Sequence, residues 1–346
     1  MAGTLSDFLS LTKPRVVILL QITAICSIIV HDMTRGGLEF GSIRTMGIVL
    51  VGGFLTAGGA NSINMWYDRD IDPIMKRTSG RAIPSGKVNS GQALIFGIVI
   101  SFLGVFWFVA LANSVAAFWS AFSILFYVLV YSMWLKRRTP QNIVIGGIAG
   151  STPPIIGWAA SEEGLSISMD SVESMTYSVL ELGSPLPWFM FALIFLWTPP
   201  HFWALALYRS KEYAEVGVPM MPNEKGANRT ILEMKFYCLM LVLLSITSPF
   251  CFETISEDGW SFHLLGWNAV GLSIWYASTV WRIDVSEEPD ETGRIASAAN
   301  SFFVSMLYLA LMFVVLVSAS FGTIGAMIGV FISLGMIGKS ELSTSS

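Results

Sequence analysis

The chain of 346 residues is strongly apolar, with 53% hydrophobic residues, 13% charged residues and a formal net charge of −4. Its mean hydropathy is +0.64. Soluble domains usually carry roughly a quarter charged residues, so a soluble fold would have to expose this apolar excess. The composition also excludes a disordered chain, and three cysteines are too few for a disulfide scaffold. We therefore predict an all-α polytopic membrane protein that has the lipid bilayer as its surroundings and no nucleic-acid partner.

Nine transmembrane helices around a central cavity are predicted. The run from Val88 to Leu135 has 48 residues without a charge; as a helix it spans about 72 Å and must cross a ~30 Å hydrocarbon core twice, turning at Asn113–Ser114. The nine helices are expected near residues 15–32, 44–66, 91–112, 115–135, 142–160, 187–208, 231–252, 262–281 and 297–319. The Gly-rich run 321–338 is left open as a tenth span, a re-entrant segment or a loose tail. We expect residues 1–320 to form a single domain and residues 321–346 a tail.

The placement of cations predicts the orientation in a cell membrane. With the N-terminus in the cytoplasm, 17 of the 20 Lys and Arg residues fall on the inner side, as the positive-inside rule requires. The outer side keeps Arg35, Arg44 and, if there are nine spans, Lys339. The outer loop 161–186 has five carboxylates and no cation, and its role is not apparent from the sequence.

The first polar inner loop carries the strongest chemical signal. Asn64, Asp68 and Asp72 are spaced i, i+4, i+8, so on a helix they share one face with neighbours about 5–6 Å apart. Hard oxygen ligands of this kind suit Mg²⁺ together with substrate phosphates. The cations that follow, Lys76, Arg77 and Arg81, would hold the remaining phosphate charge. The alternative is a solvated helix end with ordinary ion pairs, which is the interpretation we favour for Asp70 because it points elsewhere.

A second inner loop repeats this pattern. A helix again ends in acid and base together, here Glu212 with Arg209 and Lys211, and Glu212 could complete a metal and diphosphate clamp. A third inner segment brings Tyr131 and Lys136 to the same surface as further diphosphate contacts, although its cations could equally be a topology signal.

Two proline pairs and one histidine lie inside predicted spans. Pro153–Pro154 and Pro199–Pro200 are expected to interrupt their helices, which is tolerated where freed backbone lines a cavity. His201 follows the second pair, and a polar group within a span is costly and often functional. We keep two interpretations of His201: a contact for a substrate head group, and a hydrogen-bonded packing residue.

Together these residues predict a Mg²⁺ and diphosphate site at the inner mouth of an apolar helical cavity. The substrate implied is a lipid diphosphate such as an isoprenoid diphosphate. The low-dielectric cavity would hold its chain while metal and cations stabilise the leaving diphosphate. A second, nucleophilic substrate would then trap the allylic carbocation.

The motif Asn64-x-x-x-Asp68-x-x-x-Asp72 resembles the first aspartate-rich motif of the UbiA superfamily of intramembrane prenyltransferases. The closer resemblance is to its heme O synthases, and it covers residues 8 to about 320. The resembling segments are Lys13–Val16, Asn64–Gly86, Tyr131–Asn142, Pro153–Trp158 and Pro200–Pro222.

The resemblance implies transfer of farnesyl from farnesyl diphosphate to a vinyl group of heme B, giving heme O. It also implies that Mg²⁺ is held by Asn64, Asp68, Asp72 and Glu212, and that Lys76, Arg77, Arg81 and Lys211 contact the diphosphate. It suggests heme A synthase or terminal-oxidase assembly as a partner. One departure is that Val216, and not Asp, follows Glu212 by four residues.

Two alternative functions are retained. A UbiA-type enzyme with another acceptor, such as a quinone precursor, a chlorin or an archaeal lipid, would not need the segment Pro199–Trp203. A secondary transporter would place ionisable residues near the bilayer midplane, whereas here the acids lie near the two mouths.

Overall fold

The computed structural model describes residues 3–75, 78–209, 217–255, 259–287 and 295–345, and these ranges contain helices and no strand. Proposals about Lys76, Arg77, Lys211 and Glu212 lie outside the described residues. In chain order the helices are α1 Leu5–Leu11, α2 Pro14–Thr34, α3 Phe40–Tyr67, η1 Asp68–Asp70, α4 Ser90–Leu111, α5 Ser114–Leu125, η2 Phe126–Leu135, α6 Asn142–Ser151, α7 Pro153–Ser161, α8 Val172–Leu180, α9 Leu186–Tyr208, α11 Met221–Lys225, α12 Ala227–Ile246, η3 Ser248–Cys251, α13 Trp260–Trp281, α14 Ala296–Ser320 and α15 Gly322–Ser345.

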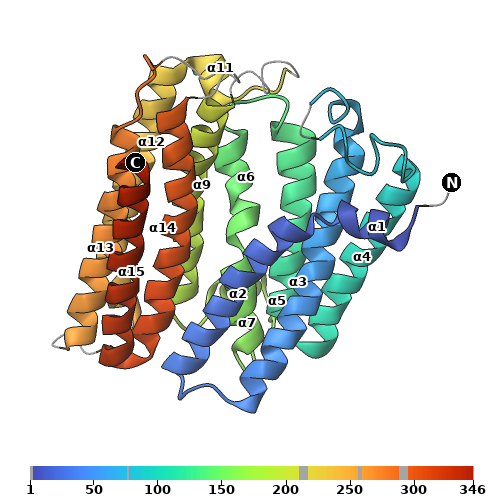
Figure 1. Cartoon of the computed structure of the whole chain (residues 1–346). Coiled ribbons are helices and arrows are strands. Elements are labelled where there is room, and N and C mark those ends of the chain that lie inside the picture. The colour runs from blue at the N-terminus through green and yellow to red at the C-terminus, as the bar shows by residue number, and fades with distance from the viewer. Residues whose placement is uncertain (1–2, 76–77, 210–216, 256–258, 288–294, 346) are drawn as a thin grey trace.

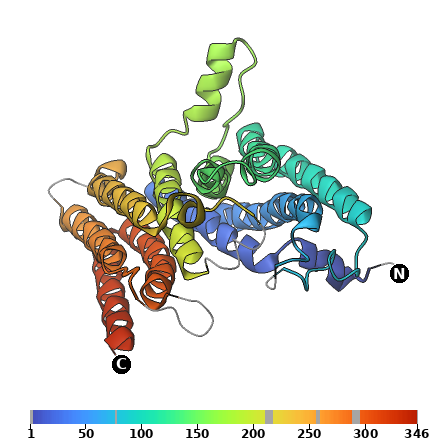
Figure 2. The same ribbon diagram turned by 90° about the horizontal axis from the view of Figure 1, so that it is seen from above.

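The long helices form a bundle of two neighbouring groups (Figure 1). Helices α2 to α7 make one group and α9 to α15 the other, and they meet where α2 packs on α14 and where α6 and α7 pack on α9. Seen along the bundle, the two groups lie side by side (Figure 2). The predicted turn is confirmed, because Asn113 caps the start of α5 by accepting the Ala116 N–H at 2.9 Å.

Helices form at all nine predicted places, but the count of nine is not confirmed. Eight helical segments in the described part of the chain are long and apolar enough to cross a membrane, so the protein is a multi-pass membrane protein. Those eight include Gly322–Leu342 and omit α12 and α13. Helix α12 is less apolar because its first turns carry Arg229, Glu233 and Lys235.

The C-terminal segment is helical and turns back along the bundle. Helix α15 packs on α13 and α14, and Glu341 near its end accepts from Trp275 Nε1 at 2.9 Å and from Arg282 Nη1 at 3.0 Å. Arg282 caps the end of α13, so α13 and α15 end on the same side of the bundle. Lys339 therefore lies at the same end of the bundle as Arg282, whereas nine spans would place these two residues at opposite ends.

The two proline pairs behave differently. Helix α6 ends at Ser151 and α7 begins at Pro153, so the predicted break at Pro153–Pro154 is confirmed. Pro199 and Pro200 instead lie inside the continuous helix α9, and the predicted interruption there is wrong. Neighbouring helices re-satisfy backbone freed by proline in a membrane helix, and α9 packs on α6, α12 and α14.

Small residues bring α3 and α4 close together. A Cβ added to Gly59 would lie 2.7 Å from the Gly97 carbonyl oxygen and 2.9 Å from the Ser101 backbone nitrogen. Such close approach through small residues is typical of helix packing in membranes, where apolar side chains gain nothing by leaving lipid. The contact fixes α3, the helix whose C-terminal end carries the predicted aspartates.

Candidate active site

Asn64, Asp68 and Asp72 share one face as predicted, although the α-helix ends before Asp68. Helix α3 ends at Tyr67 and a 3₁₀ turn covers Asp68–Asp70, yet backbone i, i+4 hydrogen bonds continue. The Asp68 N–H donates to the Asn64 carbonyl, and the Asp72 N–H donates to the Asp68 carbonyl at 2.9 Å. The three side chains are all buried, with at most 3% of each residue exposed. They therefore follow one another at one-turn spacing, as the sequence predicts.

Asn64 is held between two partners from distant segments. Its Oδ1 accepts from Lys13 Nζ at 3.0 Å, and its Nδ2 donates to Ser132 Oγ at 3.0 Å. Ser132 lies in the π-helical segment η2 and donates in turn to the Tyr127 carbonyl. Since π-helical turns occur often at functional sites, this irregularity supports a site here.

Lys13 has a strained backbone. Its φ of 52° makes it the one non-glycine residue with positive φ in the described chain, although it precedes Pro14, where extended backbone is normal. Burial, followed by the nearby Arg81 and Lys136 cations, lowers the pKa of Lys13 to about 7, while Asp68 and Asp72 act in the opposite direction. Strain of this kind persists only where surrounding contacts impose it, often at functional sites.

Asp68 is the most enclosed carboxylate. Lys136 Nζ donates to its Oδ2 at 2.5 Å, and Arg137 Nη2 lies 3.7 Å from its Oδ1. That Oδ1 is buried and has no hydrogen-bond partner. A buried carboxylate oxygen without a partner is costly, so it marks a place where a cation or a donor from a substrate fits.

Asp72 is paired with the cation that the sequence assigned to phosphate. Arg81 Nη1 donates to both carboxylate oxygens at 2.8 Å, and Thr78 Oγ1 donates to the Asp72 carbonyl at 2.8 Å. Charge-assisted bonds of this type are stronger than neutral ones. Arg81 thus positions Asp72 and remains close to any diphosphate that Asp72 helps to bind.

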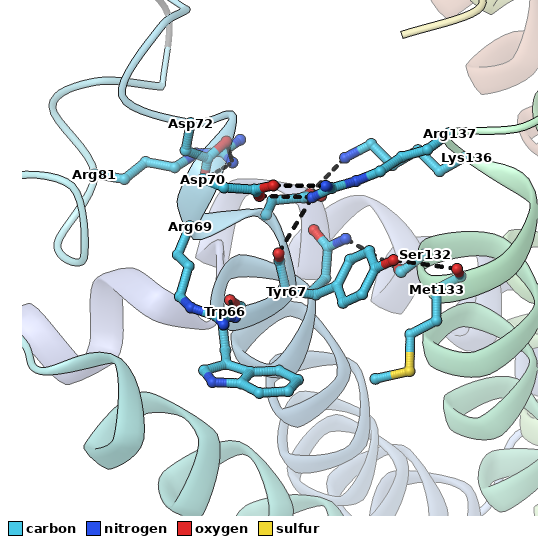
Figure 3. A network of polar contacts seen from close by, with 12 residues as sticks. Trp66, Tyr67, Arg69, Asp70, Asp72, Arg81, Ser132, Met133, Lys136 and Arg137 are labelled. Atoms are coloured by element: carbon cyan, nitrogen blue, oxygen red, sulfur yellow. Dashed lines mark hydrogen bonds and ion pairs between the residues drawn. The ribbon is translucent and has the colours of Figure 1, made fainter. Parts of the chain in front are cut away.

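Asp70 points away from this face, as predicted. Arg137 holds it through two bonds of 2.6 and 2.7 Å, and 58% of its side chain is exposed against 1% for Asp68 (Figure 3). Arg137 also lies over the Tyr67 ring, 4.7 Å from its centroid. The sequence placed Lys13 and Arg137 among the inner cations and in resembling segments but assigned neither to the site, because their partners lie far away in the chain.

The remaining predicted site residues are placed less directly. Tyr131 stacks on Tyr127 with ring centroids 5.4 Å apart, in the same π-helical segment as Ser132. Arg209 caps the end of α9 and lies over the Tyr208 ring at 5.6 Å. Neither contact tests a role in diphosphate binding, which stays a prediction for both residues.

His201 has the contacts of a packing residue. Its Nδ1 lies 2.6 Å from Ser305 Oγ on α14, and its ring stacks between Trp197 and Phe302 at 4.2 and 4.8 Å. These contacts join α9 to α14. A role for His201 in binding the acceptor stays a prediction.

The residues present fit a magnesium ion. No group of three or more His, Cys, Asp or Glu side chains is found in the described ranges, and Glu212 lies outside them. Mg²⁺, however, usually takes only one or two carboxylates and completes its shell with water and substrate phosphate. Asn64, Asp68 and Asp72 offer such oxygens, and the unpartnered Oδ1 of Asp68 is one that a metal would satisfy.

Residues 24–298 match the UbiA prenyltransferase family, and the chain belongs to this family. It is thus a multi-pass membrane enzyme of the prenyltransferase class. A relative from Beijerinckia indica subsp. indica, described as protoheme IX farnesyltransferase, is 40% identical over 96% of this chain and 93% of its own length. A relative with the same description from Bartonella henselae is 40% identical over 90% of this chain and 89% of its own.

Solved structures share the fold. A digeranylgeranylglyceryl phosphate synthase matches with a TM-score of 0.67 and 16% identity, covering 91% of this chain and 98% of its own. A UbiA homologue from Archaeoglobus fulgidus, bound to DMAPP and Mg²⁺, matches with a TM-score of 0.61 and 14% identity, covering 92% of this chain and 99% of its own.

Proposed function

We propose that this chain transfers the farnesyl group of farnesyl diphosphate to a vinyl group of heme B, giving heme O. The observation that carries the proposal is the 40% identity over nine-tenths or more of the chain to relatives described as protoheme IX farnesyltransferase. The buried polar face at the end of α3, surrounded by cations, supports the same chemistry.

The cations of the site would bind and stabilise the leaving diphosphate. Arg81, Lys136 and Arg137 balance the three aspartates of this loop, and Lys13 adds positive charge when it is protonated. In a low-dielectric setting, preorganised positive charge of this kind stabilises the diphosphate as the allylic C–O bond breaks. Lys76, Arg77, Arg209, Lys211 and Tyr131 would add further contacts.

Asn64, Asp68 and Asp72, with Glu212 from the second inner loop, would hold Mg²⁺. When bound, this ion supplies Lewis-acid charge that neutralises the diphosphate oxygens. Support comes from the unpartnered Asp68 Oδ1 and from the Mg²⁺ and DMAPP bound to the homologue of the same fold from Archaeoglobus fulgidus. Lys136 and Arg81 keep the two carboxylates in place.

The transfer forms one carbon–carbon bond and releases diphosphate. The vinyl alkene attacks C1 of the farnesyl cation, water adds to the new cation and loses a proton, and a hydroxyethylfarnesyl group results. We place the site on the cytoplasmic side of a cell membrane, with a cytoplasmic N-terminus, because most cations then lie inside. Heme A synthase or terminal-oxidase assembly would receive the product.

The test is an assay of membranes that contain the protein. They are incubated with heme B, farnesyl diphosphate and Mg²⁺, and the haems are separated by chromatography and weighed by mass spectrometry. The proposal predicts a haem heavier by one farnesyl group and one hydroxyl group, formed only when all three components are present. Prenylation of an aromatic quinone precursor without any farnesylated haem would overturn the assignment of heme B and leave the family assignment unchanged.

A further inference from the structure

The segment 161–186, at the end of the bundle opposite the candidate site, forms a hairpin arm. Residues 162–171 run outward, α8 returns toward the bundle, and the arm extends sideways beyond the other helices (Figure 2). Its length and its five carboxylates are unrelated to the transfer reaction proposed above.

Both ends of the arm are fixed to the bundle. Glu162 accepts from Arg35 at 3.2 Å and lies 3.0 Å from His31 Nε2, and Arg35 also donates to the Gly183 carbonyl at 3.3 Å. Trp158 Nε1 donates to the Leu182 carbonyl at 3.0 Å. The arm is therefore an ordered part of the fold whose two ends are fixed to the bundle.

Two contacts to α5 position the arm. Ser114, the first residue of α5, accepts the Ile167 N–H of the outgoing segment at 2.9 Å. Trp119, five residues further along α5, donates to the Val179 carbonyl of α8 at 3.1 Å. The C-terminal end of α8 therefore lies beside the first turns of α5, which is part of a membrane span, and α8 runs across the bundle from there (Figure 2).

Helix α8 carries serines and apolar side chains on neighbouring faces. Ser174 and Ser178 face the outgoing segment, where Ser168 bonds both hydroxyls at 3.0 and 3.1 Å. Val172, Met175 and Val179 are spaced i, i+3, i+7 and share the next face, while the exposed Tyr177 and Leu180 lie on the side of Glu173. Val179 is buried near the bundle, whereas Val172 is 77% and Met175 39% exposed.

Exposed apolar side chains also occur on the neighbouring helix α5. On α5 itself the large side chains Phe118 and Leu125 are exposed, as expected for a helix that contacts lipid tails. The carboxylates Asp170 and Glu173 lie at the outer tip and on the flank of α8. An amphipathic helix with its apolar side seated about 5–10 Å into the boundary of headgroups and acyl chains has this arrangement.

We propose that α8 is an interfacial helix that seats Val172 and Met175 in the lipid of the leaflet opposite the candidate site. The occupant of the exposed face is thus phospholipid and not a partner protein. The position of the C-terminal end of α8 beside the first turns of a spanning helix favours lipid, because a surface offered to a soluble partner would stand clear of the membrane. The arm anchors this end of the bundle laterally in the leaflet.

The test uses spin labels on the full chain reconstituted in phosphatidylcholine vesicles. Cys26, Cys238 and Cys251 are first replaced by alanine. Single cysteines are then introduced as Val172→Cys and Met175→Cys on the apolar face, and as Asp170→Cys and Glu173→Cys as matched controls on the same arm. Collision of each label with oxygen, which partitions into lipid, is compared with collision with a water-soluble nickel complex.

The proposal predicts a ratio of oxygen to nickel accessibility several-fold higher at positions 172 and 175 than at 170 and 173. Equal and high nickel accessibility at all four positions would overturn it and would leave the face open for a protein partner. Immobilised labels at 172 and 175 that neither reagent reaches would also overturn it, since the face would then be buried in protein.

Discussion

Lys13 is the residue where backbone strain and site chemistry meet. Its positive φ turns the chain between α1 and α2 so that its ammonium reaches Asn64 at 3.0 Å. A strained backbone conformation costs of order 1–3 kcal/mol. The contacts around Lys13 hold it in this conformation, which suggests that its position serves the site.

We predict that Lys13→Met lowers kcat/KM for farnesyl diphosphate by about ten- to a hundredfold, because a hydrogen bond to a charged group contributes roughly 1.5–3 kcal/mol. Lys13→Gly is the matched variant: it relieves the backbone and removes the ammonium, so it should be equally impaired. Heme O formation measured over a range of farnesyl diphosphate concentrations checks both. Near-normal activity in Lys13→Gly would show that only the turn matters.

The site could be predicted from the sequence where its signal is local. The spacing of Asn64, Asp68 and Asp72 follows the helical repeat, so one face was evident without knowledge of the fold. The partners could not be foreseen in the same way. Lys13 lies 51 residues from Asn64, and Arg137 lies 67 residues from Asp70. Only packing of α2, α3 and η2 brings such groups together.

His201 provides a second test at this scale. His201→Phe keeps a ring between Trp197 and Phe302 and removes the contact with Ser305. If His201 is a packing residue, the melting temperature falls, as expected from the loss of about 1 kcal/mol, and KM for heme B stays the same. A raised KM for heme B with an unchanged melting temperature would instead indicate contact with the acceptor.

Among the helix pairs, the packing of α3 on α4 has the most direct effect on the candidate site, because it positions the end of α3. Gly59 and Gly97 let the two backbones approach closely, which holds the end of α3 where Lys136 and Arg81 can reach its carboxylates. The sequence predicted the extents of both helices from apolar runs. It did not predict their pairing, because glycines inside an apolar run carry no local signal of their neighbour.

We predict that Gly59→Ala destabilises the protein by about 1–3 kcal/mol, since the new methyl would overlap the backbone of α4. Gly47→Ala is the matched control on the same helix, because nothing lies within 4 Å of its added Cβ. It should be neutral or stabilise by about 0.5–1 kcal/mol. Thermal unfolding in detergent measures both variants, and equal melting temperatures would contradict the close packing.

Proline pairs show the limit of element prediction. Thr152 separates α6 from α7 ahead of Pro153, whereas α9 runs through Pro199 and Pro200. Both pairs look alike in sequence. The outcome depends on the helices packed around each pair, and such packing is not encoded in the pair itself.

For the whole molecule, the number of membrane-crossing helices determines on which side of the membrane the C-terminus lies. Glu341 bonds Trp275 and Arg282, so α15 returns to the side of the bundle where α13 ends. We expect α12 and α13 to cross together with the eight apolar segments of the described residues, which gives ten crossings and places both termini on one side. Hydropathy alone could not settle this, because α15 is rich in glycine and α12 carries charge.

A reporter fused after Ser346 should therefore read as cytoplasmic. Fluorescent protein and alkaline phosphatase fusions at this end, compared with the same fusions at the N-terminus, measure it. The account predicts fluorescence and no phosphatase activity at both ends. Phosphatase activity at the C-terminal fusion alone would show that the two termini lie on opposite sides of the membrane, which requires an odd number of crossings.

We propose that the buried face of Asn64, Asp68 and Asp72 carries out prenyl transfer. Heme O formation by Asp68→Asn is compared with that by Asp70→Asn, its exposed neighbour, in variants of equal melting temperature. Asp68→Asn removes a charge from the enclosed site and should lose at least about a hundredfold in rate, as removal of a preorganised charge typically does. Asp70→Asn loosens Arg137 but leaves the charges of Asp68 and Asp72 in place, so it should lose less than about tenfold. Equal activity in the two variants would contradict the account.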